Sequence, residues 1–337
     1  MTHPAQPSKR PSKRPSKRSS ERSSEGSSPL AHMVLLAGAP ERLLALRLAM
    51  SSVIGPSSVV LDAGCGSLGV LAIMAARLGA RRVVAVDLGP LDAARALAEE
   101  NGVADRIEFH QGDLAGLPAA TGTFDVMLGM IYHNEPRRDL AQQQLMAGLA
   151  TRFAHPGTAF IPSIVRYTVV GYDSAGPDRT DRTRNDRWDT AVGRAEAIAG
   201  ISMAAIQEFP GTEYASFLER LLPSLGPRAA RLRRALAGPD LTMLTSRALF
   251  TEIRYADPAT AAAYPPDLAL TVTGAGRLDT TIWRQDLMAG DLLIRSTETS
   301  HPVTPPRDVQ PGDTAILSTS GLWGAAIPLT AFVPRAT

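Results

Sequence analysis

The sequence predicts an α/β fold with a parallel sheet in its first half, followed by a β-rich domain in its second half. Three observations carry this prediction: a β-branched run that ends in a glycine-rich turn, further strand-like runs that alternate with helical patterns, and alternating polar and apolar residues beyond residue 163. Strands that alternate with helices indicate βαβ units, whereas strict alternation is typical of half-buried strands. We therefore expect two sheets of different kinds.

The most informative segment is a strand, a tight turn and a helix start. The run 59–63 is apolar apart from Asp62, and Gly64, Gly66 and Gly69 follow it. Glycines allow positive φ angles and let a ligand lie against bare main chain. The next helix, expected from Leu68 to about Leu78, would offer unpaired N–H groups at its N-terminus.

Three more strand-like runs follow, and carboxylates stand at the ends of two of them. The run 82–87 ends in Asp87, the run 106–110 leads to Asp113, and the third run covers 124–128. A carboxylate about twenty residues after the glycine turn is placed to bind the hydroxyls of a ribose. The remaining expected elements of this sheet are helices at 90–100 and about 139–153 and a strand at 154–162. The glycine spacing alone also fits a NAD site.

Together these segments resemble the class I S-adenosylmethionine (SAM) methyltransferases. The resemblance implies that the loop from Asp62 holds the amino-acid part of SAM, Asp87 the ribose and Asp113 the adenine amino group. The residues expected to contact SAM in this half are Asp62, Gly64, Gly66, Asp87, Leu88, Asp113 and Leu114. A nucleotide-binding fold with another ligand is the alternative.

A helix expected at 40–50, directly before the first strand, extends the resemblance to the protein arginine methyltransferases. Its pattern is amphipathic, and Pro40 suits the first turn. In that family a helix at this place lies over the bound SAM, and Arg42 matches the arginine that pairs with the SAM carboxylate. A planar guanidinium binds a carboxylate through two parallel hydrogen bonds. A solvated helical arginine is the alternative.

The second half of the chain supports the same resemblance. Residues 163–172 are typical of a long strand that leaves the first sheet, 245–255 and 267–273 alternate, and 310–313 is a Pro-Gly turn. The run 200–206 is similar to a Gly-Phe-Asp-Met segment near the dimerisation arm of that family. The expected parts are a disordered basic tail at 1–28, a Rossmann-like SAM-binding domain at 29–162, and a β-barrel-like substrate and dimerisation domain at 163–337 with a helical insert at about 207–240.

The loop after the fourth strand departs from that family, and this departure changes the expected substrate. Arginine methyltransferases carry two glutamates there, which hold a guanidinium and balance its charge. Here Met130 stands in the place of the first, and Glu135 or Asp139 could serve as the second. We expect His133 or Glu135 to accept a proton and Tyr132 to contact the acceptor or the sulfonium. Loop residues without a role in catalysis are the alternative.

Composition and charge restrict the partners. Residues 1–28 hold seven Lys or Arg against two Glu, although the whole chain has a net charge of only +2. This segment has no aromatic residues for base stacking, so nucleic acid is not the expected partner. No apolar run is long enough to span a membrane, no secretory signal is recognisable, and the single cysteine, Cys65, fits a reducing cytoplasm. No cluster of potential ligands predicts a metal.

Three functional hypotheses remain open at this point. The first is a SAM-dependent methyltransferase that acts, as a homodimer, on a nitrogen of a small molecule such as a secondary metabolite or amino-acid derivative. The second is a protein arginine N-methyltransferase that uses Glu135 with a rearranged partner acid. The third is a non-catalytic SAM-fold scaffold.

Overall fold

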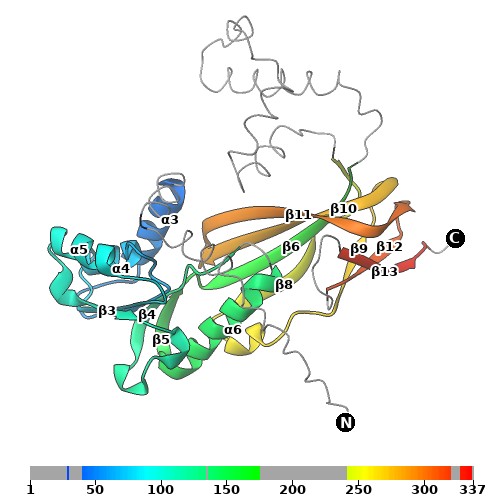
Figure 1. Ribbon diagram of the computed structural model, residues 1–337. Coiled ribbons are helices and arrows are strands. Elements are labelled where there is room, and N and C mark those ends of the chain that lie inside the picture. The colour runs from blue at the N-terminus through cyan, green and yellow to red at the C-terminus, as the bar shows by residue number, and fades with distance from the viewer. Residues whose placement is uncertain (1–28, 30–39, 134–135, 175–240, 320–326, 336–337) are drawn as a thin grey trace, which may run out of the picture.

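The structure, a computed structural model, describes residue 29 and residues 40–133, 136–174, 241–319 and 327–335. Two sheets of different kinds make up this described part (Figure 1), which confirms the predicted fold class. The expected tail at 1–28, the run at 200–206 and the helical insert at 207–240 lie outside the described residues.

The first sheet contains five parallel strands in the order β3-β2-β1-β4-β5. These strands are β1 (Val59–Ala63), β2 (Arg82–Asp87), β3 (Ile107–Gln111), β4 (Phe124–Leu128) and β5 (Ala154–Ile161). The helices that precede and connect them are α3 (Pro40–Ser51), α4 (Val70–Arg77), α5 (Asp92–Glu100), α6 (Pro136–Phe153) and the short η1 (Ala104–Arg106), η2 (Leu114–Gly116) and η3 (Ala119–Thr121).

The position of β1 explains its composition. It lies in the centre of the sheet, and all five of its residues are buried, because central parallel strands are covered on both faces. The strand order reverses between β1 and β4, and in such sheets the crevice for a ligand lies beyond the carboxyl ends of the strands at this point. The glycine turn after β1 and the loop after β4 meet there.

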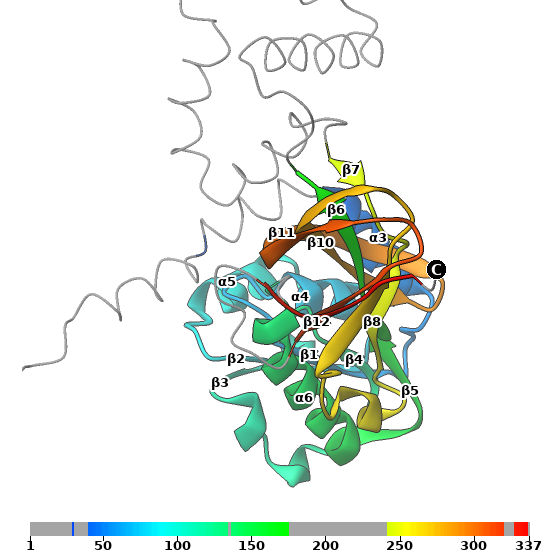
Figure 2. The ribbon, with the colours of Figure 1, turned by 90° about the vertical axis from the view of Figure 1, so that its right-hand side faces the viewer.

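The second sheet is long and curled, as Figure 2 shows. Its strands follow the order β7-β6-β10-β11-β13-β12-β9, and β8 pairs with β6. They are β6 (Ile164–Asp173), β7 (Thr242–Met243), β8 (Ala248–Arg254), β9 (Asp267–Thr271), β10 (Gly276–Ala289), β11 (Leu292–Val309), β12 (Thr314–Ser318) and β13 (Ile327–Val333), with the short helix η6 (Pro258–Ala261) after β8. The long hairpin of β10 and β11 covers a region in which the sequence analysis predicts no strands.

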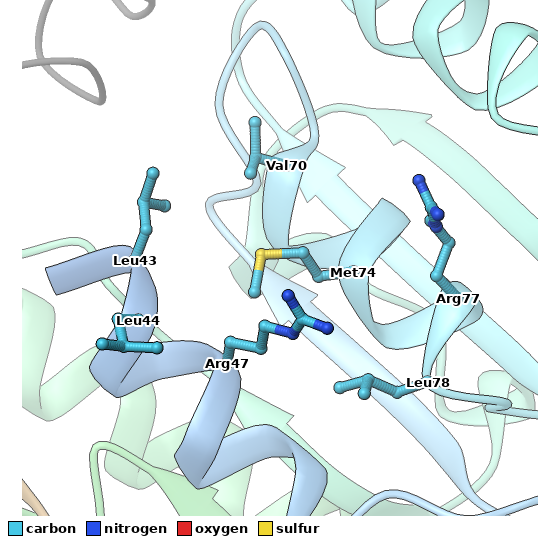
Figure 3. A pocket seen from close by; sticks show the side chains of 7 residues that line it. All are labelled: Leu43, Leu44, Arg47, Val70, Met74, Arg77 and Leu78. Atoms are coloured by element: carbon cyan, nitrogen blue, oxygen red, sulfur yellow. The ribbon is translucent and has the colours of Figure 1, made fainter. Parts of the chain in front are cut away.

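A groove lies on the outer side of the first sheet, between α3 and α4 (Figure 3). Its volume is about 510 Å³. Leu44 on α3 is 59% exposed, and the neighbouring Leu48 is exposed as well. The residues that line the groove are Leu43, Leu44, Arg47, Val70, Met74, Arg77 and Leu78.

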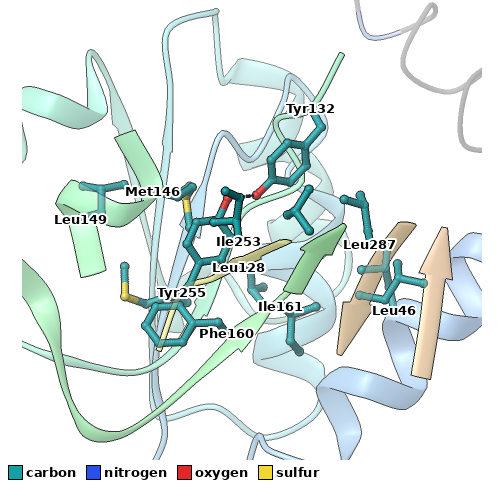
Figure 4. Packing of buried hydrophobic residues seen from close by; sticks show 14 of the residues in the cluster. Leu46, Leu128, Tyr132, Met146, Leu149, Phe160, Ile161, Ile253, Tyr255 and Leu287 are labelled. Carbon is teal, nitrogen blue, oxygen red and sulfur yellow. Dashed lines mark hydrogen bonds between the residues drawn. The ribbon is translucent and has the colours of Figure 1, made fainter. Parts of the chain in front are cut away.

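One continuous core joins the two sheets (Figure 4). Leu46 of α3, Leu128 of β4, Tyr255 after β8 and Leu287 of β10 belong to the same cluster of buried residues. Outside this core, Gln144 of α6 donates a hydrogen bond of 3.0 Å to the carbonyl of Ala262. The second sheet therefore packs against the edge of the first where the candidate site lies.

Candidate cofactor and acceptor site

The glycine turn after β1 is packed tightly against the loop after β4. Gly64, Gly66 and Gly69 all have positive φ angles, of 75°, 70° and 56°. A Cβ atom added to Gly64 would lie 2.2 Å from Cγ2 of Ile131. The backbone N–H groups of Gly64 and Cys65 both donate to the carbonyl of Val86, which ties the turn to β2. The turn is therefore held between β2 and the loop after β4.

Asp62 is a buried carboxylate without a partner. It is 1% exposed, and neither of its oxygens has a hydrogen-bond partner among the described residues. Burial raises the pKa of Asp62 to about 7; the backbone N–H of Ala72 opposes this increase, and the charge of Asp87 adds to it. An isolated buried carboxylate is costly, so this site fits a cationic group of a ligand.

Arg42 offers the complementary charge from α3. Its side chain is half-buried, and its Nε atom is buried without a hydrogen-bond partner in the described structure. Burial lowers the pKa of Arg42. Because the amino-acid part of SAM carries an ammonium and a carboxylate, Asp62 and Arg42 fit its two charges.

Asp87 ends β2 and shapes the turn. Its Oδ2 accepts a hydrogen bond of 2.8 Å from the N–H of Gly66, and its Oδ1 accepts one of 2.8 Å from the N–H of Gly89. Each carboxylate oxygen can accept a second hydrogen bond, so ribose hydroxyls can still bind. Leu88 is 74% exposed, which leaves an apolar side chain free to cover a ligand.

Asp113 lies on the neighbouring strand end, after β3. Its Oδ1 accepts a hydrogen bond of 3.0 Å from the N–H of Ala115 and so caps η2, whereas Leu114 is buried. The N–H of Gly112 donates to the carbonyl of Asp87 at 2.8 Å. This contact holds the two carboxylate-bearing loops side by side, as the order of parallel strands requires.

The predicted catalytic residues belong to the loop after β4, residues 129–135, which we call the acceptor loop. Tyr132 is buried, and its hydroxyl forms a hydrogen bond with that of Tyr255; burial, more than any other cause, raises the pKa of Tyr132. The side chain of His133 is exposed, and its Nε2 lies 3.4 Å from Nε2 of Gln142. Glu135 lies outside the described residues. The roles of Tyr132, His133 and Glu135 stay predictions.

The sequence analysis names Asp139 as a possible second acid of the clamp, but it misses the buried polar network to which Asp139 belongs. Asp139, near the start of α6, is 0% exposed and accepts a hydrogen bond of 2.5 Å from the N–H of His133. The Tyr167 hydroxyl and the Gln285 Nε2 each donate to it at 2.7 Å. Arg295 on β11 in turn donates to Oε1 of Gln285 at 2.9 Å. Three of these five residues come from the second sheet.

Comparisons with known proteins agree with this geometry. Residues 60–151 match a family described as a methyltransferase domain. The ribosomal protein L11 methyltransferase of Pelotomaculum thermopropionicum is 34% identical over 168 residues, which cover 46% of this chain and 49% of that protein. The enzyme of the same name from Pelobacter propionicus is 47% identical over 78 residues, or 23% of this chain and 24% of that one. The chain thus spans half or less of the curated relatives it matches.

The similarity to solved structures extends over both sheets. The Trypanosoma brucei PRMT1 enzyme–prozyme heterotetrameric complex with AdoHcy gives a TM-score of 0.56 at 17% identity, covering 87% of this chain and 89% of that chain. Protein arginine methyltransferase 10 of Arabidopsis thaliana gives 0.52 at 18% identity, covering 87% and 88%. At this level of identity the similarity concerns the fold alone.

The first sheet with its glycine turn therefore forms a class I SAM-dependent methyltransferase domain. The chain as a whole has the fold of the protein arginine methyltransferases, with a SAM-binding sheet followed by a half-barrel. In the described ranges, no three His, Cys, Asp or Glu residues are grouped so that they could bind a metal. The helices of those ranges are also too short or too polar to cross a bilayer.

Proposed function

We propose that the protein transfers a methyl group from SAM to a nitrogen atom of a small molecule. One observation carries this proposal: the Asp62 carboxylate, buried directly before the glycine turn, and the half-buried Arg42 guanidinium on α3 both have polar atoms without a hydrogen-bond partner among the described residues. An amino-acid moiety with one positive and one negative group would satisfy both.

The ends of β1, β2 and β3 and the helix α3 then each have one task in binding the cofactor. Asp62 holds the ammonium, Arg42 the carboxylate, Asp87 the ribose hydroxyls and Asp113 the adenine amino group. Bound SAM supplies an electrophilic methyl group on a sulfonium. The protein contributes mainly alignment, because a well-placed acceptor can react at a high effective concentration.

The acceptor nitrogen gains the methyl group and gives up a proton to the protein. His133 is exposed at the edge of the acceptor loop, and its imidazole is the first candidate to accept this proton. Glu135 is the second candidate for this role. Ile131, packed on Gly64, helps to exclude water from the crevice.

A small-molecule acceptor is supported by the sequence of the loop after β4 and by the contacts of Asp139. Met130 stands where the arginine methyltransferases carry their first glutamate, and Asp139 already accepts hydrogen bonds from His133, Tyr167 and Gln285. The fold itself favours a second candidate, a protein arginine methyltransferase that uses Glu135.

The test uses the full chain, labelled SAM and two kinds of acceptor. Calorimetry should show binding of S-adenosylhomocysteine, and Asp62→Asn or Arg42→Gln should weaken it about tenfold or more, whereas the exposed Arg81→Gln should not. Label should reach free amino acids rather than an Arg-Gly-rich peptide. Transfer to the peptide would support the second candidate, and cofactor binding without any transfer would support a scaffold.

We further propose a homodimer in the cytoplasm. The exposed leucines of α3 and the groove between α3 and α4 support a protein partner at that face. The similar complex from Trypanosoma brucei is an oligomer, a heterotetramer. The single cysteine fits a reducing compartment.

A further inference from the structure

The loop after β3 is bound by an arginine of another element, the helix α6. Arg152 lies in the last turn of α6, and its Nη1 donates a hydrogen bond of 2.9 Å to the carbonyl of Ala115. Its Nη2 donates a second hydrogen bond, to the carbonyl of Leu117. One planar guanidinium therefore binds both η2 and the residue that follows it.

The guanidinium of Arg152 is itself held against the core. Its Cζ lies 4.7 Å from the centre of the Phe153 ring, and a guanidinium over an aromatic ring is held by cation–π attraction. Phe153 is 1% exposed, and its ring packs edge-on against that of Phe124. Although Arg152 is an exposed residue, its contacts therefore tie η2 to the buried part of the first sheet.

The helix η2 in turn carries Asp113, which divides its two carboxylate oxygens between two tasks. Its Oδ1 accepts a hydrogen bond of 3.0 Å from the N–H of Ala115, the same residue whose carbonyl binds Arg152. Its Oδ2 takes part in no hydrogen bond with the described residues, and Asp113 is exposed. One oxygen thus fixes the turn, and the other is left for a ligand.

The direction of this free oxygen depends on the hydrogen bonds of η2. Leu114 and Leu117 are buried and anchor the turn, but apolar burial is not directional. Hydrogen bonds, in contrast, weaken steeply when their distance or angle is wrong. The bonds from Arg152 therefore set the orientation of η2, and with it the orientation of the Asp113 carboxylate.

We propose that Arg152 is a positioning residue of the cofactor site, which aims the free oxygen of Asp113 at the adenine amino group. This inference rests on the proposed function, in which Asp113 binds that group. Preference for a purine with an amino group then depends on an arginine that does not touch the cofactor. The helix α6 would serve the site at both ends, because Asp139 near its start binds the N–H of His133.

The test measures, by calorimetry, how tightly the full chain binds two ligands. These are S-adenosylhomocysteine and its analogue in which hydrogen replaces the 6-amino group of adenine. The wild-type protein should bind the analogue about tenfold or more weakly, because a hydrogen bond to a carboxylate is lost. Asp113→Ala should abolish this difference. Arg152→Gln should weaken the binding of S-adenosylhomocysteine about threefold or more and that of the analogue much less, so that the ratio of the two affinities falls.

Two further variants serve as controls. Arg138→Gln changes an exposed arginine near the other end of α6 and should leave both affinities unchanged. Arg152→Lys keeps the charge but loses the planar fork that binds two carbonyls, and should give an intermediate ratio. It also takes the place of Arg152→Gln if that variant does not fold. The melting temperature of each unliganded variant separates an effect on stability from an effect on the ratio.

Three outcomes would overturn the inference. An undiminished ratio in both Arg152 variants, with or without a lower melting temperature, would make the contact purely structural. Equal weakening of both ligands would have the same meaning. Equal binding of the two ligands by the wild-type protein would remove the adenine amino group from Asp113. If the wild-type protein bound neither ligand, the proposed function would fall together with this inference, whereas the other outcomes leave the binding of SAM intact.

Discussion

At the scale of single residues, Asp62 links the stability of the protein to its ligand. Its pKa is raised by burial to about 7, so the unliganded folded state favours the protonated form. A folded pKa above the unfolded value means that this stabilisation is present at low pH and is lost as the pH rises towards 7. Above that pH, the protein retains an unpaired buried charge that a ligand ammonium would neutralise.

Asp62→Asn should therefore stabilise the unliganded protein at pH 8 while it weakens cofactor binding about tenfold or more. The gain in the free energy of unfolding is at most about 4 kcal/mol, from about 1.4 kcal/mol per pKa unit, and it should shrink as the pH falls to 4. Urea unfolding of both proteins at several pH values measures it. A difference in stability that does not change with pH would contradict the role of the charge.

The sequence predicts residues well where the partner is near in the chain and poorly where it is far. The strands that carry Asp62 and Asp87 follow from apolar runs next to a glycine turn and form where predicted, whereas the roles of the two carboxylates towards SAM stay predictions. The hydrogen bond between Gln285 and Asp139 joins residues 146 positions apart, and one of them lies on a strand that no local pattern predicts. Nothing in the sequence near Tyr132 indicates that its hydroxyl meets Tyr255.

At the scale of elements, the contact between the glycine turn and the acceptor loop is the tightest point of the site. Gly64→Ala should destabilise the protein more than Gly79→Ala. Both residues have positive φ, which costs an alanine about 1–2 kcal/mol, but only at Gly64 would the new Cβ meet another side chain, that of Ile131. Thermal unfolding of the two variants measures the difference.

The double variant Gly64→Ala with Ile131→Ala separates the two causes. The double variant should regain the stability that Gly64→Ala loses through the collision with Ile131. It should not regain the stability that is lost because alanine disfavours a positive φ angle. If Gly64→Ala and Gly79→Ala lost the same stability, the close packing of turn and loop would be refuted.

The elements of the first sheet were predictable because their burial leaves a clear pattern. All residues of β1 are buried, and its apolar run therefore predicts a strand clearly. The helix α4 begins at Val70 rather than at Leu68, because Gly69 has a positive φ that a helix cannot accommodate. The strand β11 escaped prediction since most of its 18 residues are exposed or half-buried, so apolar periodicity is weak there.

At the scale of the whole molecule, we expect the groove between α3 and α4 to form the interface of the proposed homodimer. Leu44→Arg places a third cation beside Arg47 and Arg77 and should convert the proposed dimer into monomers. Sedimentation velocity measures the change. Leu249→Arg is the matched control, because Leu249 is 57% exposed but lies on β8, away from the groove. A wild-type monomer at tens of micromolar, or a dimeric Leu44→Arg variant, would contradict the proposal.

The succession of two different sheets was predictable from the sequence, but the contacts between the sheets were not. The change from alternating strands and helices to alternating residues near position 163 marks the passage from β5 to β6. The way in which the sheets meet depends on side chains from α3, α6, β6 and β10, whose contacts only the folded chain brings together.

The carboxylate of Asp139 makes the two halves of the molecule inseparable. Its hydrogen-bond donors come from the acceptor loop, from β6 and from β10, so residues of both halves of the chain bind this carboxylate. A nucleotide-binding half expressed by itself would leave this acid, and the apolar surface around Tyr132, open to water. A fusion of that half to a different second domain would need new hydrogen-bond donors to Asp139 at the interface before it could acquire the substrate specificity of that domain.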